Sequence, residues 1–440
     1  MSSLDYDLLL FGSVFEGEFS AAKAALQAGA NVNGHPDQPF PTIVAATITG
    51  HVGMVELLLE QGADPDRPVV EELPCPDTGI PPALLGERAL HIAARSGSVE
   101  IVTLLLERAH ADVNATDSRG CPPISAACEG QHASTEVVRL LLEAGADPAV
   151  PEANGFNALH IVAVKGHTHL VDMLYRRAPA TLNTSSADGA TSISCACYEG
   201  HEGVVSKLLA LGAMLRMPRD DSGMLPLGLA VDKGFVGVVR VLMKEGGIKA
   251  LGAGTVFPRA LFKAIRSRQA KILRLLLTVD GEEGRSEWAN TSVEGRHLLH
   301  YGAGYCYPAA VSVLLEAGAD EAARDLQGRT PGAVIGRLLE VGRGVEPQMV
   351  RGAEVAIRRM LQRGLAYRAR SWAWPSDEEP GDGDTAGAAG GGRGGAAAAA
   401  ISSPPAMKTP PVVGVRIFRS EEKGRSKFFV RFVGRYCAKE

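Results

Sequence analysis

Apolar residues occur along this chain in blocks that return at close to one interval. The block Leu-Leu-Leu-x-x-Gly-Ala-Asp occupies residues 57–64 and 140–147, and its ending Gly-Ala-Asp recurs at 318–320. A second landmark precedes such blocks, a Leu or Ile that leads a short run of small residues. These landmarks are Ile43, Leu90, Ile124, Leu159, Ile193, Leu227, Leu261 and Leu299. Most are 34 or 35 residues apart, and this period with two apolar segments per unit predicts a stacked array of helix-turn-helix units.

The unit at residues 155–188 shows how the pattern predicts two short helices. Leu159, Val162 and Ala163 stand at i, i+3 and i+4 and therefore share one face of a helix. Gly166 is expected to end that helix, because glycine adopts a left-handed C-cap at little cost. A second helix is predicted from Leu170. Neither helix is long enough to be stable alone, so each unit must pack on its neighbours.

The residues around these landmarks resemble the ankyrin repeat family over roughly residues 5–365. The family signature is Asp-x-x-Gly-x-Thr-Pro-Leu-His-x-Ala-Ala, then Gly-His, then a Leu-Leu-x-x-Gly-Ala-Asp ending. Its elements are spread unevenly over the repeats, as Thr330-Pro331, as His91, His160 and His300, and as Gly50-His51, Gly166-His167 and Gly200-His201. The resemblance implies that threonine caps the first helix, proline occupies its first turn, leucine enters the core, and the histidine hydrogen-bonds to the adjacent repeat.

The expected fold is therefore an all-α ankyrin-repeat solenoid of about ten units. We predict an N-terminal capping repeat at 1–37, an array at 38–327 with an insertion near 68–86, and a divergent C-terminal capping repeat at 328–375. The second helix of the last repeat is expected at Ala353 to Arg363. A Gly/Ala/Pro-rich linker at 376–411 cannot bury enough apolar surface to fold, and the basic segment 412–440 is expected to form a β-hairpin around Ser420 to Ser426.

Two departures from the period predict enlarged loops. Residues 68–82 contain five prolines, which exclude a helix and favour an exposed finger loop. This loop is either a specificity element or a tolerated insertion. About four residues are added near Gly281 to Trp288, where a loop anchored by Trp288 is expected. Trp372 and Trp374 are expected to pack against the end of the array.

Composition agrees with an intracellular repeat protein. Aromatic residues make up only 5% of the 440 residues, and the net charge of -5 gives no general preference for nucleic acid or an anionic membrane. Seven cysteines without regular spacing favour reduced thiols. The N-terminus carries acids where a secretory signal has bases, and no apolar run approaches the ~20 residues of a membrane span. We expect a cytoplasmic or nuclear monomer.

Motifs for catalysis or cofactor binding are absent from the sequence. It contains no phosphate-binding Gly-x-x-x-x-Gly-Lys-Ser/Thr, no Gly-x-Ser-x-Gly and no His-Glu-x-x-His. Cys195 and Cys197 lie two residues apart, and on a helix they point in nearly opposite directions, which argues against a shared metal; the same holds for His167 and His169. No cofactor, metal or small-molecule substrate is expected, and the chain is not expected to be an enzyme.

The candidate site is instead a protein-binding surface. In the ankyrin family, partners usually contact the finger tips and the exposed side of the first helices, which form a concave groove. The matching positions follow each landmark by five or six residues or lie at the tips between repeats. They are Arg95, Ser96, Arg119, Glu129, Glu152, Lys165, Tyr198, Glu199, Asp221, Asp232, Lys233 and Arg266. Their mixed charge favours a protein partner over a phosphate backbone.

The C-terminal segment leaves a second role open. Residues 412–440 hold eight Lys or Arg against three Glu. An isolated hairpin is marginal in water, so this segment docks on the array or stays unfolded, adds a strand to a partner, or contacts nucleic acid or an anionic membrane. The sequence thus predicts a non-catalytic scaffold that binds proteins. The alternative is an adaptor whose repeats select a client while the basic segment recruits effector machinery, membrane or nucleic acid.

Overall fold

The computed structural model describes residues 3–34, 41–70, 85–131, 133–215, 225–246, 256–278, 281–338, 347–363, 413–422 and 425–434. Residues 1–375 form one compact unit and residues 376–440 a second. Most elements described in the first unit are α-helices of six to sixteen residues. The expected all-α repeat fold with a short C-terminal hairpin is confirmed.

Helices of the first unit come in pairs, as the period predicts. The first helices of successive pairs are α1 (Ser3–Glu16), α3 (Thr42–Ile48), α5 (Ala89–Ser96), α7 (Pro123–Glu129), α9 (Ala158–Lys165), α11 (Ser192–Glu199), α13 (Pro226–Lys233), α15 (Val256–Arg266) and α18 (Leu298–Gly304). The second helices are α2 (Phe19–Gln27), α4 (Val52–Glu60), α6 (Val99–Glu107), α8 (Thr135–Glu143), α10 (Val171–Arg177), α12 (Glu202–Ala210), α14 (Val236–Val241), α16 (Ala270–Leu277) and α19 (Pro308–Glu316). Short helical turns add η1 (Thr168–Leu170), η2 (Pro179–Asn183) and η3 (Leu242–Gly246), and a last pair consists of the 3-10 turn η4 (Pro331–Val334) and α20 (Pro347–Gln362).

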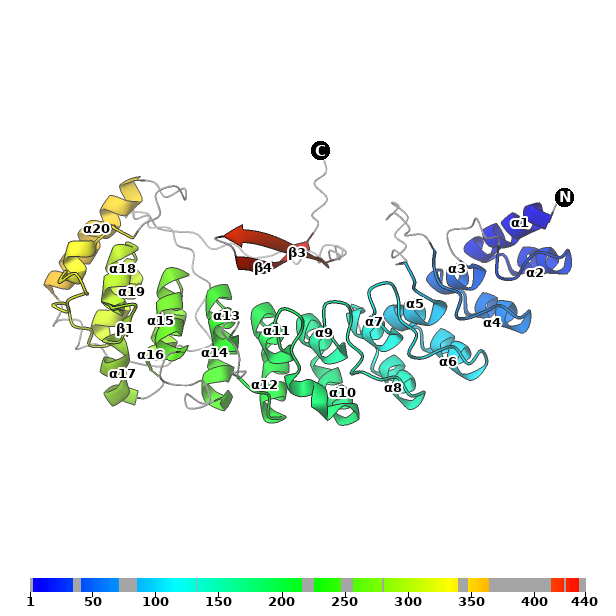
Figure 1. Cartoon of the computed structure of the whole chain (residues 1–440), viewed down its shortest axis with the longest axis horizontal. Coiled ribbons are helices and arrows are strands. Elements are labelled where there is room, and N and C mark those ends of the chain that lie inside the picture. Colours follow the sequence, from blue (N-terminus) through cyan, green and yellow to red (C-terminus); the bar gives the residue numbers. More distant parts are fainter. Residues whose placement is uncertain are drawn as a thin grey trace, which may run out of the picture. The chain divides into compact units, whose positions relative to one another are not determined.

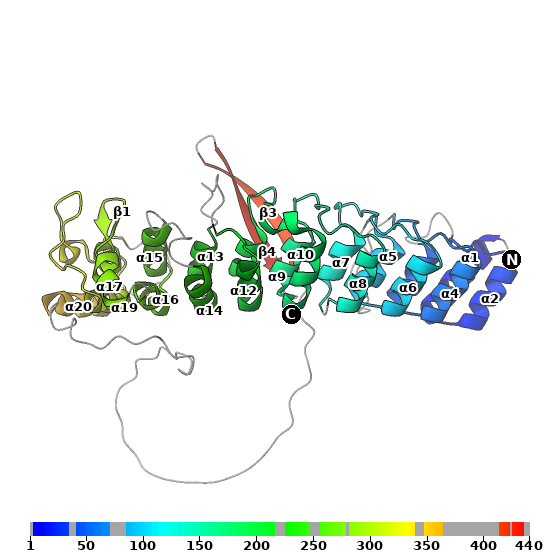
Figure 2. The same ribbon diagram turned by 90° about the horizontal axis from the view of Figure 1, so that it is seen from below.

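The two kinds of helix form two rows (Figure 1). Each first helix packs against the first helices before and after it, for example α5 on α3 and α7, and most second helices do the same in their own row. Within a pair, first and second helices also contact each other, as α5 does α6. The view from below shows the second helices side by side along the array (Figure 2). Each repeat therefore contacts mainly its sequence neighbours, as in other repeat proteins.

Small aliphatic side chains fill the space between the rows. The landmark leucines and isoleucines are buried, as are the interior leucines Leu58 and Leu141 of the second helices, which are 0% exposed. Gly166 ends α9 with φ +78°, as predicted. A Cβ at Gly166 would lie 2.6 Å from Nδ1 of His201 in the next repeat, so glycine is required both by the backbone and by the neighbouring ring.

Histidines join the repeats, as the resemblance implies. Nε2–H of His160 donates to the carbonyl oxygen of Ala190 at 3.2 Å. His91 and His300 make the same contact with Cys121 and Arg329, at 3.0 and 2.8 Å. Each of these bonds reaches the following repeat. The histidines of the Gly-His pairs bond to the preceding one, since Nε2–H of His167 donates to Gly130 O at 3.0 Å and that of His201 to Val164 O at 2.9 Å.

A ladder of polar side chains joins the ends of the second helices. Oδ1 of Asn33 accepts a hydrogen bond from Asp64 N–H at 2.8 Å, and Oδ1 of Asn114 accepts one from Asp147 N–H at 3.0 Å. Asn183 and Asn290 do the same for Met214 and Asp320. Together with the histidines, these bonds satisfy backbone groups, most of which lie in the loops between the short helices.

Two expectations for the first unit were wrong. The extra residues near 281 form a helix, α17 (Gly281–Ala289), where a loop was expected. Trp288 of this helix packs edge-on against Phe257, with ring centroids 4.6 Å apart. The last helix, α20, begins at Pro347 and not at Ala353. Most of the predicted proline-rich loop, both tryptophans after the array and the 376–411 linker lie outside the described residues.

The second unit contains an antiparallel hairpin of β3 (Val413–Glu422) and β4 (Arg425–Gly434). Its register pairs Val413 with Gly434 and Glu422 with Arg425. Both strands therefore extend into the segment Ser420 to Ser426 that was expected to form the turn. Backbone pairing between strands does not require the apolar side chains from which the strands were predicted. A smaller antiparallel pair, β1 (Ser292–Val293) and β2 (Arg296–His297), precedes α18. In the described part of the chain, none of the helices has the length and hydropathy needed to cross a bilayer.

Replacement of Leu141 by Ala tests the nearest-neighbour packing. Because Leu141 is fully buried in α8, we expect the substitution to lower the free energy of unfolding by about 2–5 kcal/mol and to uncouple the array at this repeat. Urea unfolding followed by circular dichroism measures both effects. Leu140→Ala, at a half-buried position of the same helix, serves as the control and should cost less. An unchanged cooperative transition in the Leu141 variant would contradict the packing described.

The buried histidines predict a loss of stability in mild acid. Burial lowers the pKa of His160 to about 4, from an ordinary value of 6.5. The unfolded chain therefore binds a proton here more readily than the folded one, and stability falls as the pH drops from about 6.5 towards 4. We expect this one histidine to account for a loss of about 2 kcal/mol between pH 7 and pH 5.

The variant His160→Gln isolates that contribution. It loses the hydrogen bond at pH 7 but cannot titrate, so the difference in unfolding free energy from the parent chain should shrink as the pH is lowered to 5. Chemical denaturation at several pH values measures it. The same difference at both pH values would show that His160 does not titrate as its burial requires.

Candidate protein-binding surface

Most of the predicted contact residues lie in one structural position. We call the surface formed by the last turns of the first helices, together with the loops that precede these helices, the first-helix face. The residues in those last turns are Arg95 and Ser96 of α5, Glu129 of α7, Lys165 of α9, Tyr198 and Glu199 of α11, Asp232 and Lys233 of α13, and Arg266 of α15. Arg119 and Glu152 lie in loops before α7 and α9, and Asp221 lies outside the described residues. The period thus places these side chains at equivalent points of successive repeats.

In the N-terminal half, the predicted residues bind one another. The Arg119 guanidinium donates from Nε to Asp117 Oδ2 at 3.0 Å and from Nη1 and Nη2 to the two Glu129 oxygens at 3.2 and 3.4 Å. Arg95 forms an ion pair with Glu87, whose side chain is fully buried. Arg119 therefore joins its own loop to α7, and Arg95 fixes the start of α5. We call these residues the Arg119 cluster.

Glu152 completes the Arg119 cluster from the following repeat. Burial, together with the neighbouring charge of Glu129, raises the pKa of Glu152 to about 7. Burial also raises the pKa of the Cys121 thiol far above its usual range, so the sulfur stays protonated. These groups are held in the interior of the surface and are half-buried or buried, which makes them supports for the repeats more than exposed contacts.

The Arg119 cluster also contains three groups that offer metal-ligating atoms. One such atom each from Cys121, Glu129 and Glu152 lie within 4.8 Å of one another. Both oxygens of Glu129 already accept hydrogen bonds from Arg119, so a cation here would have to displace the guanidinium. Cys195 and Cys197 are each buried and free, and burial raises the pKa of Cys195 to about 12. Their chemistry is that of protonated core thiols.

The C-terminal half presents its predicted residues differently. Lys165, Asp232, Lys233 and Arg266 are exposed. Nζ of Lys233 lies 4.0 Å from the centre of the Tyr198 ring, a cation-π contact between α13 and α11. Burial raises the pKa of Glu199, against the opposing effect of nearby His201 and two lysines. This half of the face is accessible and carries both signs of charge.

Sequence reasoning missed the residues that hold these side chains in place. Lys263 of α15 forms an ion pair with Asp232 of α13 at 2.6 Å. The contact positions chosen from the sequence follow each landmark by five or six residues, whereas Lys263 follows its landmark Leu261 by only two. The spacing rule therefore did not select it. Asp117 was missed as well, although it opens an Asp-x-x-Gly segment that the family signature contains. Its Oδ1 accepts from the backbone N–H groups of Arg119 and Cys121, each at 2.8 Å.

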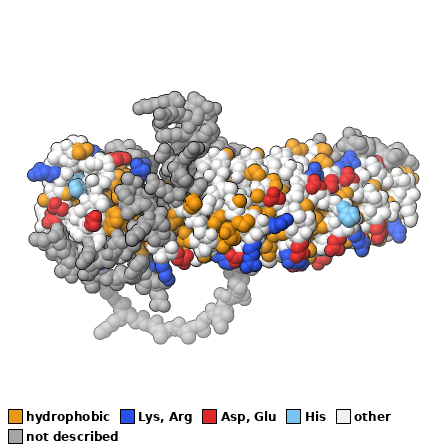
Figure 3. Space-filling model, turned by 60° about the horizontal axis from the view of Figure 1, so that its bottom comes forward, with side chains coloured by type: hydrophobic (Ala, Val, Ile, Leu, Met, Phe, Trp, Pro, Cys, Tyr) orange, Lys and Arg blue, Asp and Glu red, His pale blue; other side chains and the backbone are white. Residues whose placement is uncertain are grey.

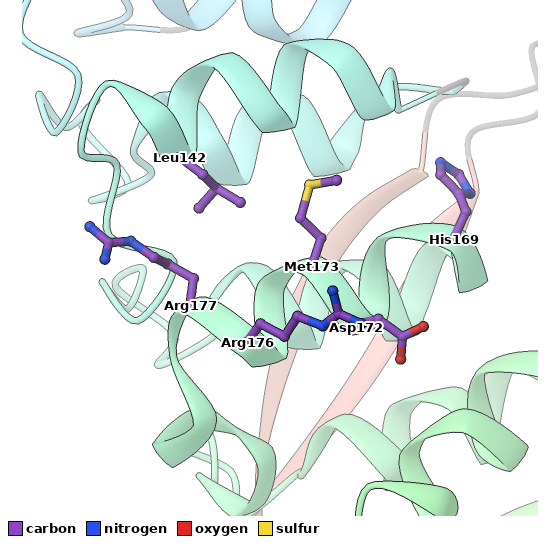
Figure 4. Close-up of a pocket in the computed structure, with 6 residues that line it drawn as sticks. All are labelled: Leu142, His169, Asp172, Met173, Arg176 and Arg177. Carbon is purple, nitrogen blue, oxygen red and sulfur yellow. The ribbon is translucent and has the colours of Figure 1, made fainter.

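The opposite face, formed by the second helices, carries a shallow cleft. Apolar side chains are visible there among charged ones (Figure 3). A space of about 440 Å³ is lined by Leu142 of α8 and by His169, Asp172, Met173, Arg176 and Arg177. Leu142 and Met173 face each other across it (Figure 4). His169 and Asp172 are already engaged, the first with Ala133 O at 3.0 Å and the second with Lys207, so this cleft offers few free polar groups.

Comparison with known proteins supports the repeat architecture. A family model for ankyrin repeats (3 copies) matches residues 10–117, 68–152, 90–185 and 159–251, which together cover more than half of the chain. The chain is 27% identical over 199 residues to the ankyrin repeat protein nuc-2 of Neurospora crassa, a match that covers 44% of this chain and 18% of that protein.

Other curated relatives differ in what surrounds the matched region. Over 255 residues the chain is 26% identical to the E3 ubiquitin-protein ligase KEG of Arabidopsis thaliana, which covers 56% of this chain and 16% of that protein. It is 34% identical over 164 residues to the ankyrin repeat and KH domain-containing protein mask-1 of Caenorhabditis elegans, covering 37% of this chain and 6% of that protein. The chain thus spans less than a fifth of the length of each of these relatives.

The raised pKa of Glu152 gives a testable stability change. Because the folded chain holds the proton of Glu152 more tightly than the unfolded one, stability from this group is present at low pH and is lost as the pH rises from 4.5 through about 7. Glu152→Gln removes the buried charge. We expect it to raise the free energy of unfolding by about 1–3 kcal/mol at pH 8, with little change at pH 4.

Chemical denaturation at the two pH values measures this difference. Glu100→Gln, at an exposed position of α6, is the matched control and should leave stability nearly unchanged at both. A Glu152 variant that is less stable than the parent at pH 8 would mean that the carboxylate is stabilised in the cluster by Arg119.

Proposed function

Because the chain belongs to the ankyrin repeat family, we propose that it is a non-catalytic scaffold that binds partner proteins through its first-helix face and finger loops. The family match over residues 10–251 shows the repeats, and ankyrin repeats generally mediate contacts between proteins. Beyond this general role, we propose which surface of the chain binds, that the chain is not a catalyst, and that its binding surface is ordered before a partner docks.

One observation carries the choice of surface. Lys165, Asp232, Lys233 and Arg266 all lie in the last turns of first helices and all are exposed. The helices that bear them, α9, α13 and α15, pack against the first helices on either side. A surface that is ordered before binding loses little conformational entropy when a partner docks. A modest number of exposed side chains on such a surface therefore gives useful affinity.

The proposal also covers the oligomeric state of the protein and its location in the cell. We place it in the cytoplasm or nucleus, because the cysteines that are described are free and buried, and we propose that it is a monomer. The E3 ligase among the relatives shares only 16% of its length with this chain, so its activity does not transfer. The adaptor alternative rests on a different observation, the basic hairpin of β3 and β4 in the second unit.

Cross-linking mass spectrometry separates the scaffold from the adaptor. The full chain and a version that ends at Pro375 are incubated in cell extract, cross-linked, and their partners identified. Residues 1–375 form a compact unit of their own, so the shorter chain keeps the array. If the protein is a scaffold, both chains capture the same partners through lysines of the first-helix face. Loss of a distinct set of partners from the shorter chain would favour the adaptor.

A matched pair of variants tests the surface itself. Lys165→Glu with Lys233→Glu reverses two exposed charges on the first-helix face, and Arg176→Glu with Arg177→Glu reverses two on the second-helix face. We expect the first pair to reduce partner capture by about tenfold or more, equivalent to at least 1.4 kcal/mol, and the second pair to leave it unchanged. Equal capture by both, or loss only with the second pair, would show that the binding surface lies elsewhere.

A further inference from the structure

The eighth helix pair differs from the rest of the chain in charge. Residues 256–278 contain six Lys or Arg and no Asp or Glu, whereas the whole chain has a net charge of -5. Arg259, Lys263 and Arg266 stand at i, i+4 and i+7 of α15 and so lie along one stripe of that helix. Arg266 ends a first helix, and Lys263 reaches back to α13, so the stripe runs along α15 from Arg259 in its first turn onto the first-helix face at Arg266.

Contacts divide these cations into two groups, and Lys271 belongs with the engaged ones. Lys263 is paired with Asp232 at 2.6 Å, and Arg274 with Glu316 at 2.8 Å. Arg268 donates to Tyr305 O at 3.3 Å and lies 5.4 Å from the centre of the Tyr307 ring. These side chains join α15 and α16 to the neighbouring repeats.

Arg259 and Arg266 form the other group. Both are exposed, and in the described part of the chain neither has a hydrogen bond or ion pair to another residue. Their guanidinium groups are therefore available for a carboxylate from outside. An Arg-carboxylate pair with two parallel hydrogen bonds is among the stronger polar contacts available to a protein surface.

We propose that the stripe of Arg259 and Arg266 binds an acidic segment of a partner protein. The proposal rests on the proposed function, since it names the chemistry of the partner for that same face. Seven residues of helix separate the two arginines by about 10 Å. Three residues of a polyproline II chain span about 9 Å and complete one turn. Carboxylates three residues apart in that conformation therefore face the same side and match the spacing of the two arginines.

The surroundings of the stripe favour a peptide over a nucleic acid. Two unpaired arginines neutralise only two phosphates, whereas nucleic-acid binding normally depends on many such contacts. Asp232 and Glu199 lie on the same first-helix face and would repel a continuous phosphate backbone. A short peptide with spaced carboxylates meets the arginines without covering those acids.

Peptide binding to the full-length chain tests the proposal. The probe is a fluorescein-labelled synthetic peptide of twelve residues, with Glu at every third position between Ser and Gly, and its counterpart has Gln in place of Glu. Fluorescence anisotropy at low salt gives the dissociation constant. We expect the Glu peptide to bind at least about tenfold more tightly than the Gln peptide, and the difference to shrink at physiological salt.

Charge reversal locates the site. Arg259→Glu with Arg266→Glu should weaken binding of the Glu peptide by at least about tenfold. Arg176→Glu with Arg177→Glu makes the same change in net charge at two exposed positions of the second-helix face, and it should change binding by less than about twofold. Thermal unfolding checks that both variants fold, and Arg259→Gln with Arg266→Gln replaces the first pair if the Glu variant is unstable.

Three results would overturn the proposal. One is equal weakening by the two pairs, which would show a general charge effect; another is unchanged binding in the Arg259 and Arg266 variant. The third is tighter binding of a labelled single-stranded RNA than of the peptide at this stripe. Failure of the proposed function appears in the cell-extract experiment instead, as the absence of captured partners on the first-helix face, so the two failures are distinguishable.

Discussion

No helix of the central repeats can hold its shape alone, and the rest of the structure depends on this constraint. Helices α3 to α13 have only seven to nine residues, which is below the length at which isolated helices are stable in water. Each is stabilised by the repeat on either side, through buried leucines and through histidines that donate to the neighbour's backbone. A substitution in one repeat therefore weakens first the interfaces with the two adjacent repeats. The rigidity of the surface that a partner contacts depends on the packing of the repeats beneath it.

Because the repeats must hold one another in place, some polar side chains are used in contacts between repeats, and others remain accessible to a partner. The Arg119 cluster consists of charged groups that satisfy one another at the junctions of three repeats, and Glu152 within it is held in part as the neutral acid. Further along, Lys263 and Arg268 join α15 and α16 to adjacent repeats, which leaves Arg259 and Arg266 unengaged. The contacts thus leave only some of the twelve sequence-predicted positions accessible, in the C-terminal part of the face. The basic stripe reaches that part through Arg266.

The period predicted most of the fold because it follows from stacking itself. Every repeat must present apolar residues to the core, and many also carry a glycine at the end of the first helix or a histidine that bonds to the next repeat, so these residues recur at close to fixed intervals. The helix α17 was not predicted, because a stretch rich in Gly and Glu carries no apolar pattern and its Trp288 finds Phe257 only in three dimensions. The pairing of Arg119 with Glu129 was missed for a similar reason: a sequence shows which residues are polar but not which of them neutralise each other.

The central claim is that the first-helix face is ordered before any partner binds. Hydrogen exchange of the free full-length chain, followed by mass spectrometry, tests it most directly. The account predicts slow exchange of the backbone amides of α5, α7, α9, α11, α13 and α15 in the absence of a partner, with little further protection when one is added. Exchange of those helices near the unfolded rate until a partner binds would contradict it, and would mean that the array folds around its ligand.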